Sequence, residues 1–165
     1  MCGLGASVQT GWSLYVNDGS GAFSLGSQAF HSDWSYGSIA LADVDGDGTV
    51  DAVTSKLEVL QNNGASGFST VQTTMETPFT ASLLRTNVID FYKVHRLVAG
   101  DVDADGDIDI LAVRDGQNWL FLNDGSGDFA RASVSHYSSI DGGDSVAAAM
   151  ADTDGDGAME FFVGN

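Results

Sequence analysis

The sequence predicts an all-β fold built from units of four short antiparallel strands, and three observations support this prediction. Short segments rich in β-branched and aromatic residues recur along the chain, separated by Gly, Asn and Asp. Two kinds of segment, one acidic and one hairpin-like, each occur three times and alternate. The acidic copies recur at intervals of about 50 residues, a period typical of four-stranded repeating units. The 165 residues therefore correspond to about three such units.

The acidic segments share one spacing of carboxylates. They begin at Asp43, Asp101 and Asp152, and each has carboxylates at positions 1, 3, 5 and 9 and glycine at position 6. So many like charges in a short segment repel one another unless a cation lies between them. Calcium takes about six to eight oxygen ligands in irregular geometry, and a glycine allows the sharp bend of a loop around it. The spacing therefore predicts up to three calcium sites.

We expect the ligands to be the side chains at positions 1, 3, 5 and 9 and the backbone carbonyl at position 7. The candidates are Asp43, Asp45, Asp47, Thr49 and Asp51 in loop 1, Asp101, Asp103, Asp105, Asp107 and Asp109 in loop 2, and Asp152, Asp154, Asp156, Ala158 and Glu160 in loop 3. Magnesium fits less well, because it retains waters and prefers octahedral geometry. A solvated turn would explain one copy, but three copies disfavour it.

The residues around the loops distinguish between known calcium motifs. An EF-hand loop needs an acidic residue at position 12, where this chain has Thr54, Ala112 and Val163. The segments after the loops favour strands rather than helices. Thrombospondin-type calcium repeats are rich in cysteine, and this chain has one Cys. From about residue 12 to residue 165, the chain resembles FG-GAP and VCBS repeats, the repeats of integrin-α-like β-propellers. The resemblance implies that each loop joins the first two strands of a four-stranded blade.

The hairpin-like segments each contain an apolar strand, an Asn, an Asp-Gly or Asn-Gly pair, and a Phe. The Asn residues are Asn17, Asn62 and Asn123. Asp-Gly and Asn-Gly between apolar runs are strong hairpin signals, because tight turns need residues that accept positive φ. We expect the Phe to begin the return strand and the segment to have a structural role.

Together the segments predict two complete blades and two half-blades. The expected strands are 38–42, 50–55, 57–62 and 68–73 in one complete blade, and 97–100, 108–113, 119–123 and 129–134 in the other. Within a single domain, 1–165, we expect a half-blade (8–30), a blade (38–75), an insertion (76–95), a blade (96–137) and a half-blade (145–165). Propellers usually have about four to eight blades. We therefore expect an oligomer, or a segment of a larger propeller, rather than a closed ring of three blades.

The predicted insertion is the one segment that interrupts the regular alternation of acidic and hairpin-like segments. It contains the only proline, Pro78, and the basic residues Arg85 and Lys93. Long loops on rigid scaffolds often bind partners, although a solvated insertion is the simpler interpretation.

The charge balance narrows the classes of partner. The chain has 23 acidic and 6 basic residues, a formal net charge of −17, and more than half of the acids lie in the three loops. This balance argues against nucleic acid and against anionic membrane surfaces. No apolar run reaches the length of about 18 residues expected of a membrane-spanning helix. The first residues lack the basic start and apolar core of a signal peptide.

The family resemblance supplies the functional expectation. It implies a secreted or cell-surface module that acts as an adhesion or protein-interaction scaffold, with calcium in a structural role. The alternative is a carbohydrate-binding propeller or an accessory domain of a secreted enzyme, for which Trp34 is a candidate sugar-stacking residue. The expected partner is thus a protein or glycan ligand at a surface. The chain has no nucleophile elbow and no phosphate-binding loop, so we expect no enzymatic activity.

Overall fold

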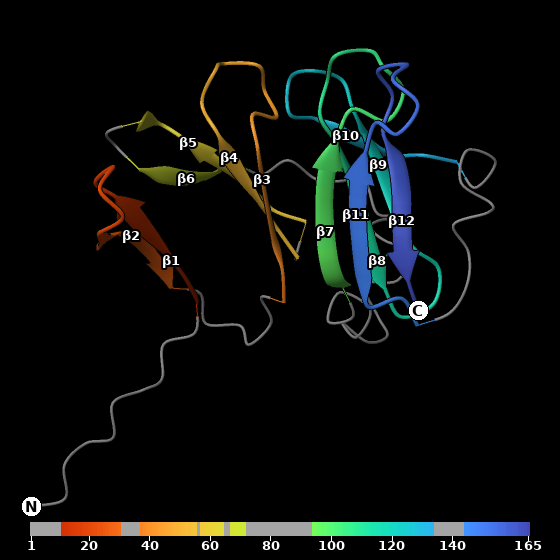
Figure 1. The fold of residues 1–165 in the computed structure, drawn as a ribbon. Coiled ribbons are helices and arrows are strands. Elements are labelled where there is room, and N and C mark those ends of the chain that lie inside the picture. Colours follow the sequence, from red (N-terminus) through yellow and green to blue (C-terminus); the bar gives the residue numbers. More distant parts are fainter. Residues whose placement is uncertain (1–10, 31–36, 56, 65–66, 72–93, 134–143) are drawn as a thin grey trace, which may run out of the picture. The chain divides into compact units, whose positions relative to one another are not determined.

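The computed structural model describes residues 11–30, 37–55, 57–64, 67–71, 94–133 and 144–165 (Figure 1). The chain divides into two compact units, residues 1–36 and 37–165, and each is described by itself. The described residues form strands that pair antiparallel with their neighbours in sequence. Within these residues, no helix has the length and apolar character needed to cross a membrane.

The first unit contains one hairpin. Strand β1 (Gly11–Asn17) pairs antiparallel with β2 (Phe23–Phe30), and Asn17 lies opposite Phe23. The register shifts between Ser13 and Tyr15, so an extra residue of β2 is accommodated there. This sheet has two strands only in the described part of the chain.

The second unit contains two four-stranded sheets, each an antiparallel meander. The first consists of β3 (Ile39–Ala42), β4 (Asp51–Thr54), β5 (Val59–Asn62) and β6 (Phe68–Val71). The second consists of β7 (Val94–Gly100), β8 (Asp109–Arg114), β9 (Trp119–Asn123) and β10 (Phe129–Arg131). Strands adjacent in sequence are adjacent in each sheet. The predicted all-β fold of four-stranded, propeller-type blades is confirmed.

A third sheet of the second unit has two described strands, β11 (Ala147–Ala151) and β12 (Glu160–Gly164). Loop 3 connects them, just as loop 1 connects β3 to β4 and loop 2 connects β7 to β8. Strands β11 and β12 therefore correspond to the first two strands of a blade. By the same comparison, the β1–β2 hairpin corresponds to the last two.

Three details of the elements differ from expectation or lie beyond it. Strand β7 begins at Val94, earlier than expected, because Val94 pairs with Arg114 of β8 beyond a register shift. The predicted insertion, 76–95, lies outside the described residues except for its last two. Trp34 lies outside them as well. The hairpin connections have the expected length of five residues. In the first of them, Asp18 N–H bonds the carbonyl of Ala22, and Gly19 and Gly21 both have positive φ.

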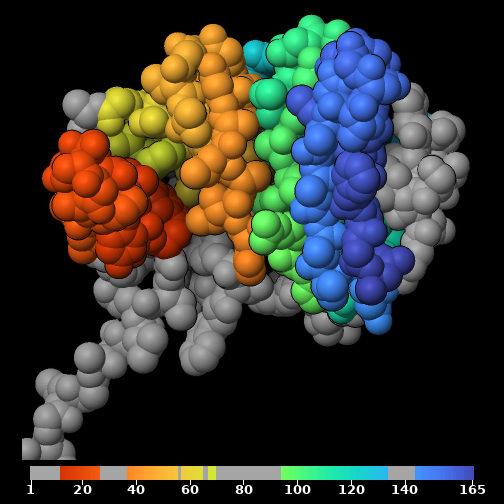
Figure 2. Space-filling view, viewed as in Figure 1, coloured from red at the N-terminus to blue at the C-terminus, as the bar shows by residue number. Residues whose placement is uncertain are grey.

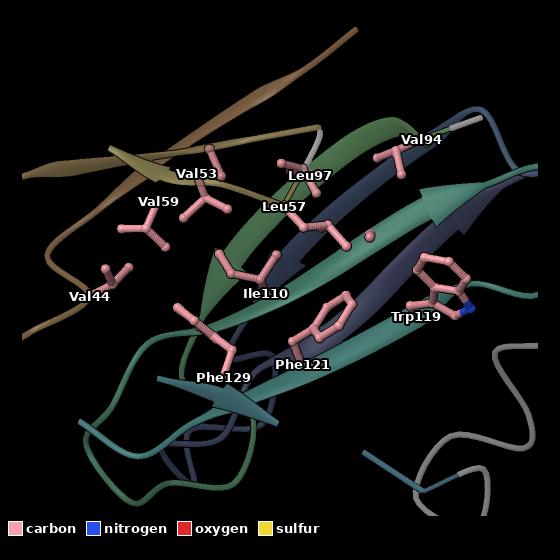
Figure 3. Packing of buried hydrophobic residues seen from close by; sticks show 12 residues of the cluster. Val44, Val53, Leu57, Val59, Val94, Leu97, Ile110, Trp119, Phe121 and Phe129 are labelled. Carbon is pink, nitrogen blue, oxygen red and sulfur yellow. The ribbon is translucent and has the colours of Figure 1, made fainter. Parts of the chain in front are cut away.

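The two four-stranded sheets share one core. Its buried side chains come from both sheets and include Val53 and Val59 of one and Leu97, Ile110 and Phe121 of the other (Figure 3). Burial of each large apolar side chain contributes about 1.5–3 kcal/mol. In β8 every residue is buried, as expected for a strand covered on both faces. The core therefore joins the blades as well as stabilising each of them.

The first strands of the three sheets lie next to one another in the second unit (Figures 1 and 2). Strand β7 contacts β3 on one side and β11 on the other. Their close approach requires small residues. A Cβ at Gly100 would lie 3.1 Å from both Met150 Sδ and Met159 Cγ. The small residues that the sequence places in these strands thus serve packing between blades.

Candidate metal centres in the three loops

Each acidic loop brings three carboxylates together. The side chains at positions 1, 3 and 9 place ligand oxygens within 4.8 Å of one another, and the groups are Asp43, Asp45 and Asp51; Asp101, Asp103 and Asp109; and Asp152, Asp154 and Glu160. The carboxylates at positions 1 and 3 lie in the loop, and the one at position 9 is the first residue of β4, β8 or β12. Oxygen ligands at this spacing suit a hard cation such as calcium.

The carboxylate at position 9 is fixed by backbone donors on two sides. In loop 2, Asp109 accepts the N–H of Val102 at 2.9 Å through Oδ2 and that of Asn123 at 2.9 Å through Oδ1. In loop 1, Asp51 accepts the N–H of Val44 at 3.2 Å and that of Asn62 at 2.8 Å. Each Asn ends the third strand of its blade. The blade sheet therefore holds this ligand in place.

The carboxylate at position 1 closes the loop on itself. It accepts the N–H of the glycine at position 6, at 2.9 Å in loops 1 and 2 and 3.1 Å in loop 3. Gly48, Gly106 and Gly157 all have positive φ, so a side chain there would be strained. The predicted bend at position 6 is present in all three loops.

The side chains at position 5 are not members of these groups, and the backbone carbonyl at position 7 stays a prediction. The side chains of Asp47, Asp105 and Asp156 instead accept the N–H of the residue at position 7, at 2.7, 2.9 and 2.9 Å. In loop 1 the Thr49 hydroxyl also bonds Asp47 at 2.7 Å and the carbonyl of Asn62 at 3.1 Å. These contacts turn the chain at positions 5 to 7. The carboxylate of Asp107 lies against Gly125 of the hairpin turn.

Loop 1 also contains a carboxylate oxygen that lacks a protein partner. Asp43 Oδ1 is buried and has no hydrogen-bond partner among the described residues. Leaving a charged oxygen buried and unbonded is costly, by about 1–3 kcal/mol or more. A bound cation would remove this cost. The neighbouring Asp45 is bonded by the side-chain amide of Gln61, which would orient it in the same group.

A family model matches the chain over the segments that contain the loops. The FG-GAP-like repeat matches residues 4–54 and 101–163, more than half of the sequence. The chain belongs to the FG-GAP-like repeat family. No curated protein and no solved structure matched it. The family and the sheet topology agree on a β-propeller-type repeat module.

Protonation distinguishes the loops of this FG-GAP-like module from one another. Burial raises the pKa of Asp109 to about 6, and the charges of Asp103 and Asp105 act in the same direction. Burial also raises the pKa of Asp51. In loop 3 the hydrogen bonds from Thr153 lower the pKa of Glu160. The carboxylate at position 9 therefore binds its proton more tightly in loop 2 than in loop 3.

Two features of the loops were not predicted. The first is that the N–H groups of Asn62 and Asn123 bond the carboxylate at position 9. The sequence indicates these residues only as turn residues, but an Asn recurs before each Asx-Gly pair and could have suggested a further role. The second is Ala104, which occupies position 4 with φ of 60°, where loops 1 and 3 have Gly46 and Gly155. An L-residue in this conformation costs about 1–2 kcal/mol.

Proposed function

We propose that this FG-GAP-like module binds calcium in its three loops, that the metal stabilises the blades, and that the module acts as an adhesion or protein-interaction scaffold. The observation that carries the proposal is the same three-carboxylate group, repeated in three loops at the same sheet position. The buried, unbonded oxygen of Asp43 in the first group supports it. An ion would offset the repulsion within each group and join the loop to the strand that follows it.

The scaffold role is supported by the position of the loops. In the second unit all three lie at the same end of the blades (Figure 1). Loops 2 and 3 contact each other through the backbone, and loop 1 contacts the end of β9. The N–H of Met159 in loop 3 bonds the carbonyl of Asp101 in loop 2 at 3.0 Å. The Asn123 side chain bonds the carbonyl of Val44 in loop 1 at 2.8 Å. Metal bound in the loops would order a continuous edge that a protein or glycan partner could contact. We propose a secreted or surface location, where calcium is plentiful, and no catalytic role.

Thermal unfolding tests the metal. Binding to the folded state alone stabilises it by RT ln(1 + [L]/Kd), and extracellular modules bind calcium at about 10⁻⁴–10⁻³ M. Millimolar calcium should therefore raise the melting temperature of the intact chain above its value in EDTA, and the same concentration of magnesium should have a smaller effect. Superimposable melting curves in calcium and EDTA would show that the loops are acidic turns without a metal.

A further inference from the structure

One residue connects the candidate metal groups of loops 1 and 2. The backbone N–H of Asn123, at the end of β9, donates to Oδ1 of Asp109, the position-9 carboxylate of loop 2. Its side-chain Nδ2 donates to the carbonyl of Val44 in loop 1 at 2.8 Å. Val44 stands between Asp43 and Asp45, two members of the loop 1 group. Asn123 therefore contacts a carboxylate of one group and the backbone of the other.

This connection is buried and is fixed at both ends. Asn123 is 7% exposed and Val44 is 2% exposed. The Val44 side chain packs in the shared core, which also contains Phe129 at the start of β10 (Figure 3). Oδ1 of Asn123 accepts the N–H groups of Gly125 and Gly127, at 3.3 and 3.2 Å. A movement of the Val44 carbonyl would therefore disturb the Asn123 side chain or leave a buried amide without its acceptor, which is costly.

The turn that follows β9, residues 124–128, also lies against both loops. A Cβ at Gly127 would lie 3.6 Å from the Cβ of Asp45, and a Cβ at Gly46 would lie 3.8 Å from the carbonyl oxygen of Gly125. Both are ordinary van der Waals distances. A Cβ at Gly125 would lie 2.7 Å from the carboxylate oxygens of Asp107 in loop 2. The conformation of this turn therefore depends on both loops.

The equivalent residue of the first complete blade makes no such connection. Asn62, at the end of β5, donates its N–H to Oδ1 of Asp51, as Asn123 does to Asp109. Its Nδ2, however, donates to the carbonyl of Val50 in its own blade at 3.0 Å. Within the described residues, the bond from this side chain to a neighbouring loop is thus made by Asn123 and not by Asn62.

We propose that Asn123 couples loops 1 and 2, so that calcium bound in either loop raises the affinity of the other loop for calcium. This inference rests on the proposed calcium binding and concerns its regulation. Coupling between two sites requires a shared element that both sites affect. Here that element is the Asn123 side chain together with the turn at 124–128.

The direction of the coupling follows from repulsion and order. In a loop without metal, the carboxylates repel one another, and this repulsion favours a more open loop. The Val44 carbonyl then holds the Asn123 side chain less firmly. A cation shared by the loop 1 group would oppose the repulsion, fix this carbonyl and order the Asn123 side chain. Less ordering then remains for loop 2, so its affinity rises, and by linkage loop 2 raises the affinity of loop 1 by the same factor.

The experiment measures this coupling factor in chains that carry Asp152→Ala, which removes the loop 3 group. Calorimetric titration gives the overall calcium-binding constant of the chain in which loops 1 and 2 are both intact. Adding Asp43→Ala leaves loop 2 alone, and adding Asp101→Ala instead leaves loop 1 alone. The overall constant divided by the product of the two single-loop constants is the coupling factor. We expect a factor of at least about five, the lower end of common couplings between sites.

Two Asn variants test whether the factor depends on Asn123. Asn123→Ala keeps the backbone N–H that bonds Asp109 and removes the bond to Val44, so the factor should fall to about one. The matched Asn62→Ala removes a side chain that bonds within its own blade, so the factor should be kept. If Asn123 only stabilised the fold, Asn123→Ala would lower the melting temperature without changing the factor. Equal factors in the two variants would overturn the inference.

A second measurement needs no substitution of Asn123. In the chain with loop 1 alone intact, calcium should shift the NMR resonances of the Asn123 side-chain amide and of the Gly125 and Gly127 N–H groups in the next blade. Binding in loop 1 without these shifts, or loops that bind independently in the two-loop chain, would overturn the coupling and leave the proposed function intact. Single-loop chains that bind no calcium would instead overturn the proposed function and the coupling together.

Discussion

At the residue scale, the carboxylate at position 9 belongs both to the candidate metal group and to the sheet. Asp109 is 1% exposed, begins β8, and is bonded by N–H groups from loop 2 and from β9. Burying a carboxylate is costly unless charge or hydrogen bonds compensate. The two N–H donors compensate in part, and a cation between Asp101, Asp103 and Asp109 would compensate further. The same residue is thus a candidate ligand and a structural element of the blade.

The loss of calcium binding on substitution should depend on whether the side chain belongs to a three-carboxylate group. Asp101→Ala removes a member of the three-carboxylate group and the acceptor for Gly106, so it should abolish calcium binding at loop 2 and cost about 1–3 kcal/mol. Thr49→Ala removes only hydroxyl contacts, so it should cost about 1 kcal/mol and leave calcium binding in place. Calorimetric titration and denaturant unfolding measure both effects. Equal loss of calcium in the two variants would contradict the assignment of positions 1, 3 and 9.

The raised pKa of Asp109 predicts that calcium binding at loop 2 weakens in acid. Since the pKa of this carboxyl is about 6, protons compete with the metal as the pH falls through 6. Loop 3, where hydrogen bonds from Thr153 lower the pKa of Glu160, should keep its calcium to lower pH. In the metal-free protein, by contrast, a lower pH favours the folded state, because the folded state binds the Asp109 proton more tightly than the unfolded state does. The folded state holds the Asp109 proton up to about pH 6 and the unfolded state releases it near 3.8, so this contribution to stability is present below 3.8 and is lost as the pH rises through 6.

Calcium titrations at pH 5 and pH 7 measure this effect. In an Asp43→Ala background, Asp152→Ala leaves only loop 2 intact and Asp101→Ala leaves only loop 3 intact. The chain that keeps loop 2 should lose more affinity at pH 5 than the chain that keeps loop 3. An equal loss in both chains would contradict the difference between the two carboxyl groups.

At the scale of elements, the Asn at the end of the third strand joins hairpin, loop and neighbouring blade. Asn123 donates through Nδ2 to the carbonyls of Val44 and Ile108, and its Oδ1 accepts the N–H groups of Gly125 and Gly127. The bond to Val44 crosses from the second four-stranded sheet to loop 1. One side chain therefore holds a turn closed, a loop in place and two blades together.

Asn123 and Asn62 form a matched pair for testing this role. Asn62 bonds Val50 and Gly64 within its own blade. Asn123→Ala leaves several buried groups without partners and should cost about 2–4 kcal/mol, whereas Asn62→Ala should cost about 1 kcal/mol. Denaturant unfolding of both variants measures the difference. Similar costs would mean that the contact between blades contributes little.

The sequence predicted the strands and the loop positions well, because apolar alternation, Asx-Gly turns and carboxylate spacing are local signals. It did not predict which carboxylates converge. Spacing alone cannot show that Asp47 bonds the backbone of Thr49 rather than joining Asp43. The early start of β7 at Val94 depends on pairing with Arg114, which is a tertiary contact. The contact of Asn123 with Val44 joins residues far apart in the chain and leaves no local pattern.

At the scale of the whole molecule, the shared core predicts that the two complete blades unfold together. Side chains of β4, β5, β8 and β9 pack in one buried cluster, so neither four-stranded sheet keeps its core without the other (Figure 3). Amide hydrogens of β4 and β8 should exchange with the same free energy of opening. Hydrogen exchange followed by mass spectrometry measures this directly. Separate exchange of the two strands would show that the blades are independent folding units.

The positions of the matched repeats have a consequence for how such a chain can grow. The first match, residues 4–54, contains β1 to β4, which is the end of one blade and the beginning of the next. The matched repeat is therefore out of phase with the four-stranded blade. A duplication of this segment would add the last two strands of one blade and the first two of the next. Each added copy would then pair with the copies on either side, so the number of blades could change while every joint between blades kept the same form.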